Sequence, residues 1–110
     1  MTQNERAAQL WSILVLAARN QQILSYAMVE KLTCLDRRGV GDCLGPVQAY
    51  CKRYDLPPLT SVVVEQETGL PGIGFTTATT TDVLPAQGRV FVYDWLSRGA
   101  PSAEDFAAVS

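Results

Sequence analysis

The sequence contains no histidine among its 110 residues. Histidine is the most common general base near neutral pH, so its absence excludes serine–histidine and cysteine–histidine catalytic pairs. The three cysteines, Cys34, Cys43 and Cys51, are too few for a four-cysteine zinc site, and their odd number does not suit a disulfide framework. We therefore interpret them as small buried apolar residues in a reduced compartment. A redox role for Cys51, beside Lys52 and Arg53, is the alternative.

Long apolar runs are also missing. The longest, over residues 10–18, is interrupted by Ser12 and falls short of the roughly 20 residues that span a bilayer. The first six residues lack the charged and apolar regions of a signal peptide. We therefore expect a cytoplasmic protein without a membrane segment.

Positive charge is scarce, because the net charge is −2 and the isoelectric point is about 4.9. This sign does not suit a protein that binds phosphate backbones over its whole surface. The charge is uneven, however: residues 30–60 carry five basic and four acidic side chains, whereas residues 61–110 carry two basic and six acidic ones. Any surface that contacts nucleic acid is therefore expected around residues 25–45.

The apolar pattern of the first half predicts helices. Apolar residues at helical spacing indicate a helix over 5–19 and two short helices within 25–45. Leu16 is assigned to the apolar stripe of the first of these helices and Leu32 to that of the second. Ser25 and Asp36 are suited to cap the two short helices. A further helix is expected to begin at Pro46, because proline suits the first turn of a helix.

The second half contains the predicted β-structure. After Pro57 and Pro58, the β-branched segment Ser61–Val64 predicts a strand. The glycines of 69–75 lack the flanking strand and helix of a phosphate loop, so we expect a bend of the backbone there. The remaining segments are predicted to be an exposed loop or edge strand at 76–81, a strand or the start of a helix at 89–95, and a last short helix at 102–109.

These elements predict an α/β, mostly α, single domain over residues 1–110. Its centre is a short helix, a turn and a second helix that begins with Arg37 and Arg38, which is the plan of a helix-turn-helix. A hairpin from Ser61 onward would form a wing, which gives a winged-helix-like domain. The alternative is a packed helical corner that binds no nucleic acid.

Several segments follow one another as they do in a known family. They are Ile23-Leu24-Ser25-Tyr26, Arg38-Gly39-Val40-Gly41, Leu56–Val63, the glycine-bearing segment Gly69–Gly74 and Tyr93-Asp94-Trp95-Leu96. Their order resembles the C-terminal domain of the O6-alkylguanine-DNA alkyltransferases and of the alkyltransferase-like proteins. The resemblance covers roughly residues 9–96.

The resemblance implies a base-flipping DNA-binding site. By position, Tyr26 would turn the phosphate of the target nucleotide and Arg38 would fill the vacated place in the base stack. From the residues alone, a partly buried helix aromatic explains Tyr26 equally well. The alternative for Arg38 is a solvated arginine at the start of a helix. The implied DNA-binding residues are Tyr26, Arg37, Arg38, Gly39 and Gly41, and the implied walls of a base pocket are Pro58, Leu59, Thr60, Ser61, Gly69 and Gly72.

The chain also departs from that family. Leu59 and Thr60 stand where the family has its nucleophilic cysteine and the histidine that follows it, so alkyl transfer is excluded. The connection between Tyr26 and Arg38 is about two residues shorter than in the family. Asp42 would place a carboxylate near phosphates, which costs on the order of 1 kcal/mol. We find no catalytic constellation and no metal or cofactor site.

The sequence therefore predicts a non-enzymatic protein that binds double-stranded DNA and recognises a flipped or modified base, as in DNA repair. The alternative is a protein-interaction adaptor that kept a winged-helix scaffold and lost its DNA surface, which the acidic tail favours. An enzyme of unknown type is a third hypothesis.

Overall fold

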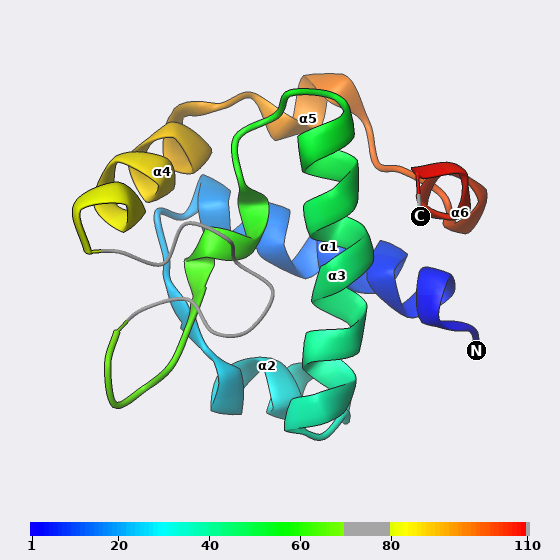
Figure 1. Ribbon diagram of the computed structural model, residues 1–110, viewed down its shortest axis with the longest axis horizontal. Helices are drawn as coiled ribbons and strands as arrows, with labels where there is room; N and C mark the ends of the chain where they lie inside the picture. The colour runs from blue at the N-terminus through cyan, green and yellow to red at the C-terminus, as the bar shows by residue number, and fades with distance from the viewer. Residues whose placement is uncertain (70–79, 110) are drawn as a thin grey trace.

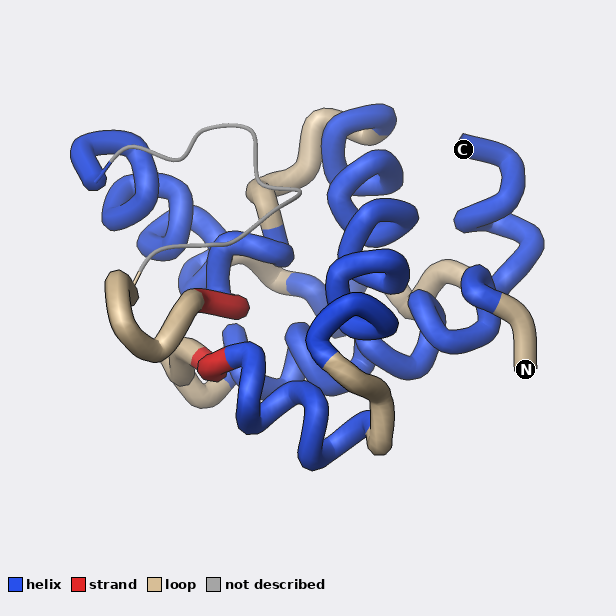
Figure 2. The backbone as a smooth tube through the Cα atoms, turned by 60° about the horizontal axis from the view of Figure 1, so that its bottom comes forward, coloured by secondary structure: helices blue, strands red, loops and turns tan. Residues whose placement is uncertain are grey.

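The computed structural model describes residues 1–69 and 80–109. It is mostly helical, with one small parallel sheet, which confirms the expected mostly α composition. Both views place the two ends of the described chain at the same side of the molecule (Figures 1 and 2). The described elements are α1 (Gln3–Arg19), β1 (Leu24–Ser25), α2 (Tyr26–Thr33), α3 (Arg37–Arg53), the 3₁₀ helix η1 (Leu59–Val62), β2 (Val63–Val64), α4 (Thr80–Val92), α5 (Trp95–Arg98) and α6 (Ala103–Val109).

Trp11 of α1 is the centre of the hydrophobic core. Its indole ring meets Tyr50 of α3 at 5.4 Å between ring centroids, Trp95 of α5 at 5.5 Å and Phe106 of α6 at 6.0 Å, each in an edge-to-face arrangement. Such aromatic pairs contribute about 0.5–1.5 kcal/mol each beyond their burial. One side chain therefore holds four helices together, and all four rings are nearly or fully buried.

The helix α3 runs through Pro46 without a break, so the predicted helix end at this proline is wrong. A proline inside a helix leaves the carbonyl four residues earlier without its usual N–H donor. Here that carbonyl belongs to Asp42, and the side-chain amide of Gln3 donates a hydrogen bond to it at 2.5 Å. A contact from α1, which the local sequence around Pro46 does not contain, satisfies the carbonyl that the proline leaves open.

The predicted strand Ser61–Val64 is largely wrong, because Leu59–Val62 form a turn of 3₁₀ helix and the strand is only Val63–Val64. This strand pairs in parallel with β1, with Leu24 opposite Val63 and Ser25 opposite Val64 (Figure 2). The described part of the predicted hairpin therefore pairs with the chain before α2. The rest of that hairpin, and the predicted bend over 70–75, lie outside the described residues.

Most predicted helices are confirmed. Helices occupy the segments expected at 5–19 and 102–109, and residues 89–92, left open between strand and helix, belong to α4. Thr80 and Thr81 also belong to α4, so the prediction of an exposed loop or edge strand is wrong for these two residues. Residues 76–79 lie outside the described residues.

The apolar stripes were predicted less well than the helices. Leu16 of α1 and Leu32 of α2, both assigned to buried stripes, are 63% and 54% exposed. Within the described ranges no helix is long and apolar enough to cross a membrane.

Cys34 provides a test of the turn between α2 and α3. It caps α2 in the left-handed conformation at φ 59°, which costs a residue with a β-carbon about 1–2 kcal/mol and glycine little. We expect Cys34→Gly to be more stable than Cys34→Ala by about 0.5–1 kcal/mol in urea unfolding. Alanine keeps the β-carbon and removes the thiol, so equal stability of the two variants would contradict the strained cap.

Candidate nucleic-acid interface

Two capped helices bring the predicted DNA-binding residues to one end of the molecule. Ser25 accepts a hydrogen bond from the Met28 amide at 3.1 Å, and Asp36 accepts one from the Gly39 amide at 2.7 Å. Both predicted N-caps are thereby confirmed. The two helices α2 and α3 are joined by only residues 34–36, so the start of α3 lies close to α2 (Figure 1).

Arg37 joins three segments in a contact that we call the Arg37 clamp, made of Tyr26, Arg37 and Glu65. The guanidinium carbon of Arg37 lies 3.7 Å from the ring centroid of Tyr26, at the start of α2. Its Nη1 donates to Glu65 Oε2 at 2.8 Å, and its Nη2 donates to Glu65 Oε1. The accepting carboxylate raises the pKa of Arg37. The sequence analysis did not include Glu65 in this site.

Tyr26 and Arg38, which were given the two base-flipping roles, differ in their access to solvent. Tyr26 is only 4% exposed, and it lies under the guanidinium of Arg37. A ring with so little surface has little to offer a phosphate, so its predicted phosphate-turning role does not follow from this placement. Arg38, the next residue after Arg37, is exposed.

The two predicted glycines of α3 differ in their surroundings. A β-carbon at Gly39 would meet Asp36 Oδ1 at 3.1 Å and the Leu35 β-carbon at 3.3 Å, so glycine leaves room for the capping turn. A β-carbon at Gly41 would meet no atom within 4 Å. The backbone of α3 is therefore accessible near Gly41.

The predicted base-pocket residues mostly lie in η1 and beside it. Leu59, Thr60 and Ser61 are buried, and Pro58 is half-buried. Gly69 is exposed, with a positive φ of 69°, and its amide donates to the Glu65 carbonyl at 2.8 Å. Gly72, also predicted, lies outside the described residues.

Two hydroxyl groups in η1 are unusual. Thr60 is 4% exposed and Ser61 is fully buried, and neither Thr60 Oγ1 nor Ser61 Oγ has a hydrogen-bond partner among the described residues. Buried polar atoms without a partner are rare and cost about 1–3 kcal/mol. The side chain of Gln87, from α4, donates to the Ser61 carbonyl at 2.8 Å and is itself 3% exposed. The sequence did not single out Gln87.

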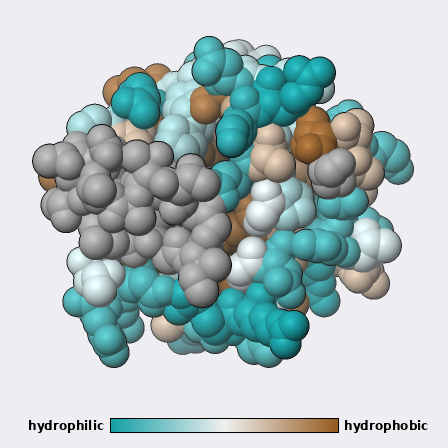
Figure 3. Space-filling view, viewed as in Figure 1, coloured by the Kyte–Doolittle hydropathy of each residue, from teal (hydrophilic) through white to brown (hydrophobic). Residues whose placement is uncertain are grey.

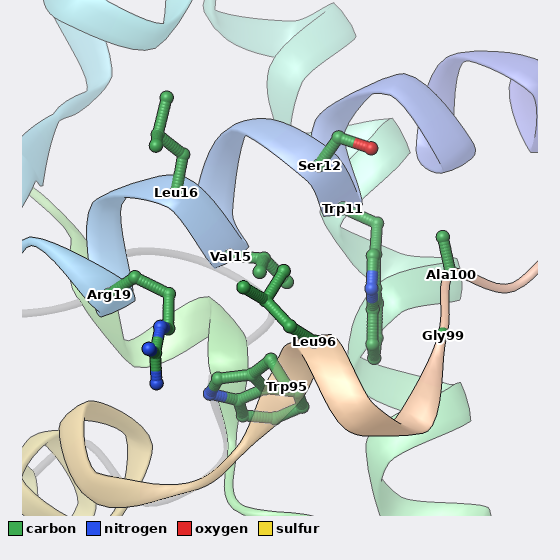
Figure 4. Close-up of a pocket in the computed structure, with 9 residues that line it drawn as sticks. All are labelled: Trp11, Ser12, Val15, Leu16, Arg19, Trp95, Leu96, Gly99 and Ala100. Carbon is green, nitrogen blue, oxygen red and sulfur yellow. The ribbon is translucent and has the colours of Figure 1, made fainter.

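A separate pocket opens between α1 and α5 (Figure 4). Its volume is about 310 Å³. Its walls include Trp11, Val15, Leu16 and Arg19 of α1 and Trp95 and Leu96 of α5. No motif of the sequence pointed to this pocket.

Cys43 and Cys51 are buried as predicted, whereas Cys34 is exposed at the end of α2, so the prediction of a buried residue is wrong there. Burial raises the pKa of the Cys51 thiol to about 11 and also raises the pKa of Cys43. Cys51 therefore stays protonated near neutral pH, which disfavours the redox alternative. Over residues 1–69 and 80–109, no three cysteine, aspartate or glutamate side chains gather as metal ligands would.

Comparisons of the chain with protein-family models, with curated proteins and with solved structures found no match.

The Cys51 thiol predicts how stability depends on pH. Its pKa of about 11 in the folded protein exceeds the value of 9.0 for an unperturbed thiol, so the folded state holds the proton more tightly. The contribution to the free energy of unfolding is constant below pH 9 and is lost between about pH 9 and pH 11. Chemical unfolding at a series of pH values should show a steeper alkaline loss in wild type than in Cys51→Ala. Parallel curves would contradict the raised pKa.

Proposed function

We propose that the protein binds double-stranded DNA through the exposed face of α3, formed by Arg38, Gly41, Asp42 and Gly45. The observation that carries this proposal is the contrast between two neighbouring arginines. Arg37 is paired with Glu65 and stacked on Tyr26, although 41% of its side chain stays exposed. Arg38 is exposed, and within the described ranges it has no ion pair. It is therefore available to a phosphate or a base edge.

The arrangement of α2 and α3 supports this proposal. A short helix, a three-residue connection and a longer helix with an exposed N-terminal arginine follow the helix-turn-helix plan. The pairing of Leu24 with Val63 also holds together the two segments that resemble parts of the alkyltransferase family, around Tyr26 and around Pro58. We extend the proposal to a winged-helix-like domain on these grounds.

The surface of α3 suits a close approach to DNA. Gly41 and Gly45, four residues apart on one face, have open space where a β-carbon would lie. The molecular surface on the side where α3 lies is mostly hydrophilic, with hydrophobic residues in small separate groups (Figure 3). A groove wall can therefore come near the helix backbone without burying large side chains.

The buried hydroxyls of Thr60 and Ser61 support the second part of the proposal, recognition of an extrahelical base. Thr60 Oγ1 and Ser61 Oγ are buried and lack partners among the described residues, so a base edge that enters when η1 moves aside would satisfy them with its donors and acceptors. In this proposal Tyr26 acts by holding Arg37 in place and does not contact the phosphate.

Arg38→Ala tests the proposal in a fluorescence anisotropy titration with labelled duplex DNA at low salt. We expect a loss of affinity of about five- to tenfold, because one exposed arginine contributes roughly 1–1.4 kcal/mol to such binding. Arg89→Ala is the matched control, since it removes another exposed arginine, from the last turn of α4. Equal affinities of Arg38→Ala and wild type would contradict the proposal.

Asp42 gives a variant of opposite sign. Its carboxylate lies one turn after Arg38 on the same face and repels phosphate. Asp42→Asn should therefore tighten binding to duplex DNA severalfold. Separately, recognition of an extrahelical base predicts that the protein binds a duplex with a modified guanine more tightly than an unmodified duplex. A gain in affinity with Asp42→Asn that Arg38→Ala cancels would locate the DNA on this face.

The adaptor hypothesis has one observation in its favour. Met28 and Leu32, one turn apart on α2, are 46% and 54% exposed, and Ile23 before α2 is 46% exposed. An apolar surface of this kind suits a protein partner. A salt series separates the two functions, because phosphate binding falls steeply with salt and an apolar contact does not.

A further inference from the structure

The pocket between α1 and α5 lies away from the proposed DNA-binding end of α3. Arg98 of α5 donates a hydrogen bond to the hydroxyl of Tyr50 at 3.0 Å, which places α5 beside the C-terminal half of α3. Arg38 is near the N-terminus of the same helix. The two sites are therefore separate, and Figure 1 shows α5 and the start of α3 at opposite ends of the molecule.

The walls of this pocket are apolar and aromatic. Trp11 and Trp95 are each 1% exposed and form the inner wall together with Val15. Leu16 and Leu96 also line the pocket but are 63% and 66% exposed. Two large apolar side chains thus remain in contact with water at its mouth, which is unfavourable unless another apolar group covers them.

A single cation completes the site. Arg19 lines one end of the pocket and Ala100 the other (Figure 4). Arg19 is exposed, and within residues 1–69 and 80–109 it has no ion pair. The walls are otherwise uncharged, so the pocket pairs an apolar trough with one positive charge at its end.

We propose that this pocket binds a small amphipathic anion, with an apolar body against Leu16 and Leu96, above the buried Trp11 and Trp95, and a carboxylate at Arg19. Charge complementarity selects the anionic head group, and the apolar walls select the body. The volume of about 310 Å³ lies at the lower end of the range for small-molecule sites, which fits a medium-chain fatty acid or a compact aromatic acid. This binding is independent of the proposed DNA binding.

The chain offers a direct readout, because both of its two tryptophans line the pocket. A bromine atom quenches tryptophan emission on contact, so ω-bromooctanoate serves as the probe and ω-bromooctanol as its uncharged counterpart. We expect saturable quenching by the acid and an affinity for the alcohol about three- to fivefold weaker, as loss of one partly exposed ion pair implies. Quenching that rises linearly to the solubility limit would overturn the proposal.

Arg19→Gln tests the charge. The variant should bind the acid as weakly as wild type binds the alcohol, whereas Arg89→Gln should leave the acid's affinity unchanged. Both arginines lie in the last turn of a helix, where a positive charge is favourable. Arg89→Gln therefore controls for the loss of a positive charge at a helix C-terminus. If Arg19→Gln lowers only thermal stability and keeps the full preference for the acid over the alcohol, then Arg19 stabilises the C-terminus of α1 and does not bind the ligand. That result would overturn the proposal.

Ala100→Phe tests the location. Ala100 is exposed at the rim, so the larger side chain should block the pocket without disturbing the core. We expect saturable quenching to disappear while the far-ultraviolet circular dichroism stays that of wild type. Saturable quenching that persists in this folded variant would place the ligand elsewhere and overturn the proposal.

Discussion

The guanidinium of Arg37 is the contact on which the geometry of the candidate interface depends. It lies at the first position of α3, stacks on Tyr26 at the start of α2 and pairs with Glu65 just after β2. Three segments that are distant in sequence are thereby fixed to one another. The same contact pairs one of two adjacent arginines with a carboxylate, which leaves Arg38 as the exposed cation of the two without an ion pair among the described residues.

A continuous α3 connects this end of the molecule to the aromatic core. The helix has 17 residues and is therefore about 25 Å long. The Arg37 clamp holds its first turn, and the contact between Tyr50 and Trp11 holds its C-terminal half. Gln3 satisfies the carbonyl that Pro46 leaves open, and the helix is continuous between these two anchors. Its exposed face is thus preorganised, which lowers the entropic cost of binding a rigid partner.

Local patterns in the sequence predicted the local structure well and the tertiary contacts poorly. Ser25 and Asp36 were identified as helix caps because a cap depends on residues only three positions away. Pro46 was misjudged because the compensating donor, Gln3, is distant in the chain. Arg37 and Arg38 were both expected to bind DNA by resemblance, because nothing local showed that Glu65 would engage Arg37. The exposure of Leu16 likewise depends on how α5 packs against α1, which helical periodicity cannot report.

The most direct test of this account is a double-mutant cycle between Arg37 and Glu65. Urea unfolding of wild type, Arg37→Gln, Glu65→Gln and the double variant isolates the energy of their contact from the effect of each substitution alone. The pair is partly exposed but bidentate, so we predict a favourable coupling of about 1 kcal/mol. A coupling of zero would show that the clamp does not fix α3 in solution and would contradict the account.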